Sequence, residues 1–340
     1  MASVDVIIPI YHPDEKVNRL LTALKTQTLT PERIILVHTG EVRKDEPEYE
    51  ADAVIRCDEN GKPMKNCPSE AKKILCEIPE ERFDHGGTRN LGASFSRAEV
   101  MVFMTQDAVP ADDRLLEVLV RAVTDGSVGA DGTNGKLSRN DAVTVAAAYA
   151  RQLPYEDCRA VERYIREFNY PEGSELRTAK DIPIRGIKAF CNSNVCSAYR
   201  RDVFDRLGGF AEKTIFNEDM LFGAAAILGG YGVGYAADAK VYHSHNLGLS
   251  DQFHRNFDNA VSQAEHPEVF AAVSSEKEGM KLVKYCLSRM REDGRLYLAP
   301  YFMLNCACRY AGFFLGKRFR KLPGWLVRAC SLNKRYWDVR

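Results

Sequence analysis

Several features are missing from this 340-residue sequence, and each absence excludes a class of protein. The ten cysteines form no Cys-x-x-Cys pair, so neither a zinc site nor a disulfide framework is indicated, and reduced thiols are expected. No Walker A motif occurs. No early segment has the basic-then-apolar pattern of a signal peptide, so a cytoplasmic protein is expected.

A net charge is missing as well, yet the charges are unevenly distributed. The 47 basic residues balance 47 acidic ones over the whole chain. Between residues 317 and 340, however, eight basic residues accompany a single acidic one, which leaves the remainder acidic. Such a tail predicts a partner of its own, and nucleic acid is not the partner expected. Its basic residues are Lys317, Arg318, Arg320, Lys321, Arg328, Lys334, Arg335 and Arg340.

What the sequence does contain is an alternation of strand-like and helix-like segments. Its β-α-β start predicts a parallel sheet with right-handed crossovers. The charged residues 40–67 are expected to form a long surface connection. Strands are expected at residues 5–11, 33–37, 74–78 and 100–104, and helices at residues 15–26, 87–97, 112–123 and 220–228.

The composition sets the number of domains. With 45% apolar residues the chain can bury a sizeable core. We predict one large α/β domain over residues 1–250 and a helical region with a basic amphipathic tail over residues 251–340.

A lone carboxylate, Asp107, follows the apolar strand expected at residues 100–104. A carboxylate at the point where a buried strand surfaces can hold a divalent metal and, through the metal, a diphosphate. The plainer alternative is a turn former or a helix cap.

Two further clusters also stand at the ends of elements. Glu218 and Asp219 open a helix, where the macrodipole favours ionised carboxylates and suits a general base, although both could be helix-start residues without a task. His243 and His245 close a strand, and alternation places both imidazoles on one face, as metal ligands or as half-buried polar surface. Their order favours a site, because α/β proteins bind ligands at element ends.

Two glycine-rich runs have different expected roles. Gly86 and Gly87 precede a helix, so their amides and Arg89 could face a phosphate, or the run could be a simple helix entry. The run at residues 229–234 follows a helix and precedes a strand, the reverse of a dinucleotide fingerprint. It is expected to be a helix C-cap and a turn.

A series of short motifs resembles bacterial rhamnosyltransferases of glycosyltransferase family 2, in order over most of the chain. The Gln-Asp-Ala form of the metal motif and the Arg-Gln-Leu-Pro and Asn-Tyr-Pro segments are typical of the rhamnosyl branch. The motifs are Pro9 and Tyr11 on the first strand and residues 83–90, 105–108, 151–154, 168–171, 186–188, 217–219 and 243–245.

The resemblance implies a fold and an activity. The fold would be a GT-A type, Rossmann-like nucleotide-diphospho-sugar transferase domain with a C-terminal helical extension. The enzyme would use Mn²⁺ or Mg²⁺ and invert the anomeric carbon. It would move a sugar, most simply L-rhamnose from dTDP-β-L-rhamnose, to a hydroxyl of a glycan or polyprenyl-linked acceptor in the synthesis of bacterial cell-surface polysaccharide.

The resemblance also implies roles for particular residues. Asp219 would be the catalytic base, with Glu218 as its runner-up. The metal would be held by Asp107 and by His243 or His245. The expected donor-binding residues are Pro9, Tyr11, Arg89, Asn90, Gln106 and Asp107, and Arg151, Gln152 and Lys188 are expected to contact the acceptor. One departure from the family pattern is that residues 38–40 are His-Thr-Gly where many relatives carry an acidic pair.

Two other classes of protein are considered. A sugar-1-phosphate nucleotidyltransferase also has a Gly-Gly-x-Gly-Thr-Arg loop, but that loop should follow the first strand, whereas Gly86 and Gly87 lie far downstream. An inert nucleotide-sugar-binding protein would suit the lone Asp107.

The segment at residues 296–316 is apolar but is interrupted by Pro300, Asn305 and Arg309, which makes it a poor membrane span. Because the basic tail follows it, we expect an interfacial helix that attaches the protein peripherally to anionic lipid at the inner face of the plasma membrane. The alternative is a helical cap on the catalytic domain with a solvated basic face.

Overall fold

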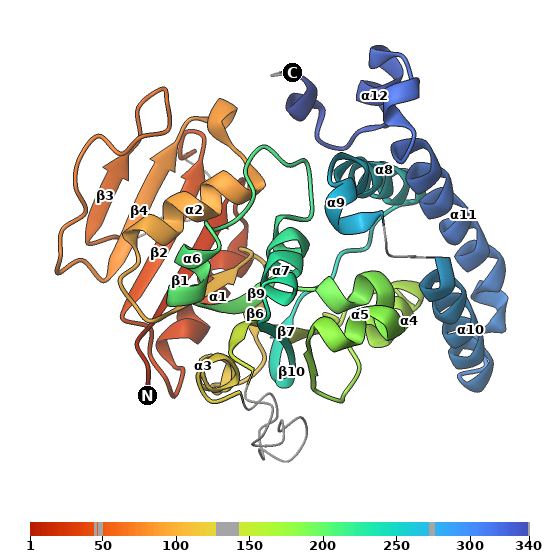
Figure 1. Ribbon diagram of the computed structural model, residues 1–340, viewed down its shortest axis with the longest axis horizontal. Coiled ribbons are helices and arrows are strands. Elements are labelled where there is room, and N and C mark those ends of the chain that lie inside the picture. The colour runs from red at the N-terminus through yellow and green to blue at the C-terminus, as the bar shows by residue number, and fades with distance from the viewer. Residues whose placement is uncertain (44–45, 47–49, 127–142, 272–275, 339–340) are drawn as a thin grey trace.

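The computed structural model describes residues 1–43, 46, 50–126, 143–271 and 276–338 (Figure 1). Arg340 of the basic tail lies outside these residues. Within them, ten strands form one sheet in the order β3-β4-β2-β1-β5-β9-β7-β10-β6, with β8 paired to β10. The strands are β1 (Val4–Ile10), β2 (Arg33–Thr39), β3 (Ala53–Arg56), β4 (Lys73–Ile78), β5 (Val100–Met104), β6 (Val109–Pro110), β7 (Val145–Leu153), β8 (Glu175–Arg177), β9 (Cys196–Arg200) and β10 (Gly232–Tyr242).

The strand directions divide the sheet into two parts. From β3 to β5 all neighbours are parallel, as the β-α-β start predicts. β9 is antiparallel to both β5 and β7, and β10 is parallel to β7 but antiparallel to β6. The chain leaves β1 first toward β2 and later returns to its other side with β5. This reversal makes the carboxyl ends of β1 and β5 the switch point at which α/β sheets bind ligands.

The sheet lies between two helical layers, each with its own apolar core (Figure 1). Alternate residues of β1 serve the two layers: Ile8 packs with the core of α1 and α3, whereas Ile7 packs with the core of α2, α6 and α7. The helices are α1 (Glu15–Lys25), α2 (His85–Phe95), α3 (Leu115–Thr124), α4 (Ala160–Asn169), α5 (Ile182–Arg185), α6 (Arg201–Arg206), α7 (Glu218–Leu228), α8 (Leu249–Glu265), α9 (Pro267–Phe270), α10 (Glu276–Glu292), α11 (Ala299–Gly316) and α12 (Gly324–Cys330).

Short 3₁₀ helices connect several of these elements. They are η1 (Glu80–Arg82), η2 (Ala179–Asp181), η3 (Gly186–Phe190), η4 (Leu296–Leu298), η5 (Phe319–Lys321) and η6 (Lys334–Trp337).

One prediction about this half of the molecule is wrong. Residues 40–67 are not only a surface connection, because β3 pairs with β4 inside this stretch. The strand has only four residues, Ala53–Arg56, and its side chains alternate between buried and exposed. Charged residues surround it, so the short alternation is not distinctive in the sequence.

The C-terminal helices pack on the sheet domain rather than standing apart from it. Tyr164 of α4 shares an apolar cluster with Cys286 of α10 and Phe302 of α11. Ile215, which precedes α7, shares another with Phe257 of α8 and Phe319. No helix in the described part of the chain is long and apolar enough to cross a membrane.

Candidate active site

Strand pairing brings the predicted metal ligands together. Asp107 lies in the turn between β5 and β6, and β6 pairs with the last two residues of β10. His243 and His245 follow β10 directly. The loop is fixed further by the hydroxyl of Tyr155, which donates to the backbone carbonyl of Asp107 at 2.9 Å.

The three side chains are close enough to share one cation. One oxygen, Oδ2 of Asp107, lies 3.5 Å from Nε2 of His243 and 3.3 Å from Nε2 of His245. One ligand atom from each residue falls within 4.8 Å of the others. A metal about 2.1 Å from each of two ligand atoms separates them by roughly 3–3.5 Å, so the spacing fits.

The charge states of these groups also fit a cation. Burial raises the pKa of the Asp107 carboxyl, but His243 and His245 outweigh that effect, and the net pKa is lowered. Burial lowers the pKa of His243 to about 3, so its ring is neutral at physiological pH. Ionised carboxylates and neutral imidazoles are the forms that bind metals.

A second layer of side chains orients His243. Its Nδ1 lies 3.0 Å from Oε1 of Gln152, which also accepts a hydrogen bond from Arg166 at 2.6 Å. An oxygen only accepts, so Nδ1 carries the proton and the lone pair of Nε2 points toward Asp107. Gln152 is 4% exposed. The structure therefore places this predicted acceptor-binding residue behind a metal ligand.

The two carboxylates at the start of α7 have different surroundings. Glu218 is buried, forms an ion pair with Arg89 at 3.3 Å and accepts a hydrogen bond from the side chain of Asn194 at 3.1 Å. Asp219 is partly exposed and accepts from the backbone N–H groups of Asn194, at 3.0 Å, and Met220, at 2.7 Å.

These surroundings separate the pKa values of the two groups. Burial, together with the neighbouring charge of Glu218, raises the pKa of Asp219 to about 7. Burial also raises the pKa of Glu218, but Arg89 and His85 outweigh it and the net pKa is lowered. A pKa near the working pH is the property of an effective general base, so Asp219 has the environment of a base and Glu218 that of a structural anion.

Ser193 and Asn194 join the two clusters, and the sequence analysis did not predict a role for them. Gln152 donates through Nε2 to the hydroxyl of Ser193 at 3.0 Å, and the next residue, Asn194, donates its N–H to Asp219. Asn194 also accepts from the buried hydroxyl of Tyr199 at 2.6 Å. Small polar residues before a short strand give no signal in the sequence, because their role depends on which strands become neighbours.

The expected donor residues at the end of β1 are fixed by Gln106. Its side-chain amide donates to the carbonyl of Tyr11 at 2.9 Å and accepts from the N–H of Tyr11 at 2.8 Å. This pair ties the end of β1 to the turn that carries Asp107. Pro9 is partly exposed within β1, and the side chain of Tyr11 is 41% exposed at the switch point.

The glycine-rich run has a packing explanation. Gly86 and Gly87 lie inside the first turn of α2, and the carboxylate of Asp84 accepts from the N–H of Gly87 at 2.5 Å. A Cβ on Gly86 would stand 1.9 Å from the carbonyl oxygen of Ala211, so only glycine allows this contact. The amide of Gly87, one of the two predicted phosphate-facing amides, is therefore already engaged.

Other predicted donor and acceptor residues hold the fold around the site. Arg89 is 6% exposed and bound to Glu218. The amide of Asn90 bonds the backbone of Phe210 in both directions at 2.9 Å.

The two remaining acceptor candidates are also paired. Arg151 pairs with Glu172 at 3.2 Å. Lys188 pairs with Glu278 of α10 at 2.8 Å and lies 4.4 Å from the centre of the Phe168 ring.

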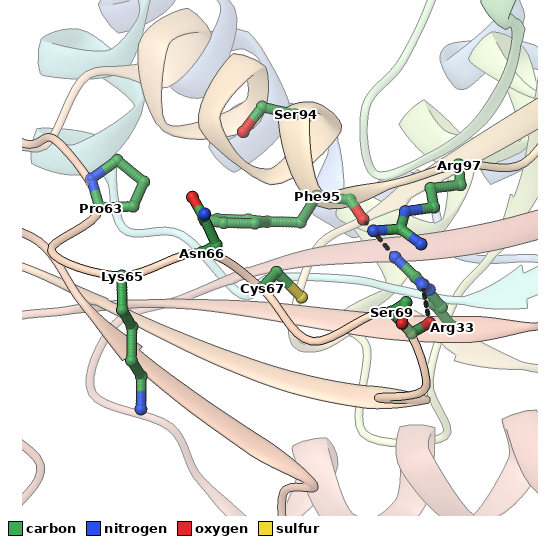
Figure 2. A pocket seen from close by; sticks show the side chains of 9 residues that line it. All are labelled: Arg33, Pro63, Lys65, Asn66, Cys67, Ser69, Ser94, Phe95 and Arg97. Carbon is green, nitrogen blue, oxygen red and sulfur yellow. Dashed lines mark hydrogen bonds between the residues drawn. The ribbon is translucent and has the colours of Figure 1, made fainter.

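A separate pocket of about 530 Å³ lies away from these clusters (Figure 2). Arg33 opens β2, so the pocket is at the amino end of that strand, opposite to the switch point. Arg33 is 8% exposed and donates to the carbonyls of Phe95, at 3.0 Å, and Ser69. No carboxylate lines the pocket among the described residues, and Arg33, one of its two arginines, is already bound to backbone carbonyls.

Comparisons with known proteins agree with this fold. The sequence model described as "Glycosyl transferase family 2" matches residues 5–208. A mannosyltransferase from Pyrobaculum calidifontis, solved with GDP-Man and Mn²⁺, has a TM-score of 0.50 and 14% identity, covering 99% of this chain and 85% of its own. The predicted class, a GT-A glycosyltransferase domain with a C-terminal helical region, is confirmed.

Two curated relatives extend over nearly the whole chain. The O-antigen chain rhamnosyltransferase RfbN of Salmonella typhimurium is 33% identical, over 98% of this chain and 96% of its own length. The O-antigen chain rhamnosyltransferase WbaN of Salmonella anatum is 31% identical, over 99% and 96%. The chain belongs to glycosyltransferase family 2, and the predicted resemblance to its rhamnosyltransferases is confirmed.

Proposed function

We propose that this glycosyltransferase transfers L-rhamnose from dTDP-β-L-rhamnose to a hydroxyl of a lipid-linked glycan in bacterial cell-surface polysaccharide synthesis. Identity above 30% to two O-antigen rhamnosyltransferases, over almost the full length, supports the sugar and the pathway. The observation that carries the chemistry is the joining of Asp219 to the Asp107 and histidine cluster through Gln152, Ser193 and Asn194.

The mechanism uses the two groups that this connection joins, Asp219 and the cluster of Asp107 with the two histidines. Asp219 takes the proton of the acceptor hydroxyl while the oxygen forms a bond to the anomeric carbon. The bond from that carbon to the donor phosphate breaks, and dTDP leaves with the electron pair. A single displacement of this kind inverts the anomeric centre, since no second carboxylate acts as a nucleophile.

Asp107, His243 and His245 would hold the divalent cation. A bound cation stabilises the negative charge of the leaving diphosphate. We infer Mn²⁺ in preference to Mg²⁺, because two of the three ligands are imidazoles and Mg²⁺ favours oxygen ligands.

We also propose that α11 attaches the enzyme to anionic membrane, where a polyprenyl-linked acceptor would lie. One face of α11 packs on α8, and the opposite face exposes apolar side chains and carries no acidic residue. Beyond α11, Lys317, Arg318, Arg320 and Lys321 supply positive charge at one end of that face. The exposed large apolar residues are Leu296 and Tyr297 on η4, Tyr301, Met303, Leu304, Tyr310 and Phe314 on α11, and Trp325 on α12.

A donor panel tests the transfer reaction. The purified protein is incubated with Mn²⁺, a polyprenyl-diphosphate-linked glycan and either dTDP-L-rhamnose, UDP-glucose or GDP-mannose. We expect a mass increase of one rhamnose on the acceptor with dTDP-L-rhamnose, and none with Asp107→Asn. Transfer from UDP-glucose but not from dTDP-L-rhamnose would overturn the sugar assignment.

Transfer of the sugar to the acceptor would distinguish this enzyme from the other two classes. A nucleotidyltransferase would form a nucleotide sugar from sugar 1-phosphate and nucleoside triphosphate, with release of pyrophosphate. An inert binding protein would bind donor without turnover.

A further inference from the structure

The last described residues of the chain reach back to the edge of the sheet that carries the donor site. Arg335 is on η6, and its Nη1 lies 2.5 Å from Oε1 of Glu80. Glu80 is on η1, which follows β4. The same oxygen accepts the hydroxyl of Tyr11 at 2.6 Å. Figure 1 draws this end of the chain between α12 and the part of the sheet that contains β3 and β4.

The segment that carries Arg335 is firmly anchored on α8. Asp258, which is 2% exposed, accepts the backbone N–H groups of Leu332 and Asn333 at 2.9 Å each. The hydroxyl of Tyr336 donates to Glu265 at 2.8 Å. The backbone that places Arg335 beside Glu80 is therefore ordered, so little conformational entropy of the chain is lost when the ion pair forms.

The position of Tyr11 at the end of β1 indicates which part of the donor it would contact. The diphosphate belongs at Asp107, after β5, and the reacting sugar belongs toward Asp219, on the side of β9. The nucleoside must then extend the other way, over the end of β1, where the exposed ring of Tyr11 stands.

We propose that Arg335 is a donor-positioning residue: it fixes Glu80, which fixes the phenol of Tyr11 at the nucleoside end of the donor site. This inference rests on the proposed nucleotide-sugar donor. It makes residues far beyond the matched family region, 5–208, part of donor binding. We call Tyr11, Glu80 and Arg335 the nucleoside clamp.

If Arg335 had only a structural role, its loss would lower the melting temperature and leave the nucleotide affinity unchanged. The side chains of Arg335 and Glu80 are 62% and 32% exposed, and exposed ion pairs contribute little to the stability of a fold. Loss of Arg335 should therefore change nucleotide affinity and leave the melting temperature unchanged.

Calorimetric titration with dTDP in the presence of Mn²⁺ tests the clamp on the full chain. We expect Arg335→Ala to raise the dissociation constant about 5- to 10-fold, and Arg335→Lys to restore part of the loss. In the transfer assay the KM for donor should rise while kcat stays close to that of the wild type. The matched control is Lys334→Ala, a neighbouring exposed cation that contacts none of the three clamp residues among the described contacts.

A double variant tests whether Arg335 acts through Tyr11. Because Tyr11→Phe removes the hydroxyl that Glu80 holds, Tyr11→Phe with Arg335→Ala should bind dTDP no more weakly than the weaker single variant. Additive losses would overturn the clamp.

The failures of the two proposals can be told apart. A wild-type dissociation constant for Arg335→Ala, with or without a lower melting temperature, would overturn the clamp and leave the proposed function standing. If the wild-type protein bound none of dTDP, UDP and GDP, the proposed function and the clamp would both be wrong.

Discussion

Glu218 and Asp219 are adjacent in sequence but differ in environment, and this difference can be measured. We expect Asp219→Asn to lower kcat by about 10²–10⁴-fold with donor affinity retained, because the base acts in the transition state. The measurement is steady-state kinetics with a separate titration of dTDP. Near-normal turnover of this variant would move the role to another residue.

The matched variant is Glu218→Gln. Removing this buried charge leaves Arg89 unpaired, so we expect a loss of about 3 kcal/mol in the free energy of unfolding. Denaturant unfolding measures it, and an unchanged midpoint would show that the pair is not structural.

The raised pKa of Asp219 predicts a pH dependence. A base works only when ionised, so with a pKa of about 7 the value of kcat should fall about tenfold per pH unit below pH 7 and level off above it. A profile of kcat between pH 5.5 and 8.5, at saturating donor and acceptor, provides the measurement. A flat profile would contradict the assignment.

Gln152 offers a test between a sequence-based role and its observed contacts. Because it holds Nδ1 of His243, we expect Gln152→Ala to weaken Mn²⁺ binding about 10- to 100-fold. Direct metal titration measures this. If the metal affinity were unchanged and the KM for acceptor rose, the acceptor-binding prediction would be the right one.

Part of the candidate site could be predicted from the sequence, and the reason is physical. Asp107, Asp219 and the histidines stand at the ends of apolar elements, where local pattern alone indicates exposure to a ligand. Ser193, Asn194 and Glu80 could not be found this way, since their contacts form between segments far apart in the chain.

At the scale of elements, continuous apolar patterns predicted strands and helices correctly, whereas one short alternating strand was not recognised. The strand predicted at residues 100–104 coincides with β5, and the helix predicted at 15–26 matches α1 within one residue. The four-residue β3 was missed, and α2 begins at His85, two residues before the predicted start, because the capping role of Asp84 was not recognised.

The contact between α8 and α11 predicts a sharp difference between two glycines. A Cβ on Gly312 would stand 2.2 Å from the carbonyl oxygen of Phe253, so Gly312→Ala should destabilise the protein by about 1–3 kcal/mol. Gly279 in α10 has open space around its Cβ position, so Gly279→Ala should be neutral or slightly stabilising. Denaturant unfolding of both variants measures the contrast, and equal effects would contradict this close packing.

At the scale of the whole molecule, part of the basic tail is engaged within the protein. Arg335 pairs with Glu80 and Arg328 pairs with Asp338, so these two cations of the basic tail are engaged within the protein. Four cations of the tail, Lys317, Arg318, Arg320 and Lys321, lie directly after α11. The sequence indicated the basic tail, but only the fold shows that Arg328 and Arg335 are paired within the protein.

Membrane attachment predicts flotation with phosphatidylglycerol liposomes at low salt and partial release at high salt. Each basic residue near such a surface contributes about 1 kcal/mol, which salt screens, whereas burial of the outer face of α11 is not screened. Because Leu304 is 51% exposed on that face, we expect Leu304→Glu to reduce flotation at every salt concentration. Leu228→Glu is the control, because Leu228 is 61% exposed at the end of α7, away from α11. We expect this variant to float like the wild-type protein. Equal flotation of the two variants, or none of the wild type, would leave α11 as a helical cap whose basic end faces only water.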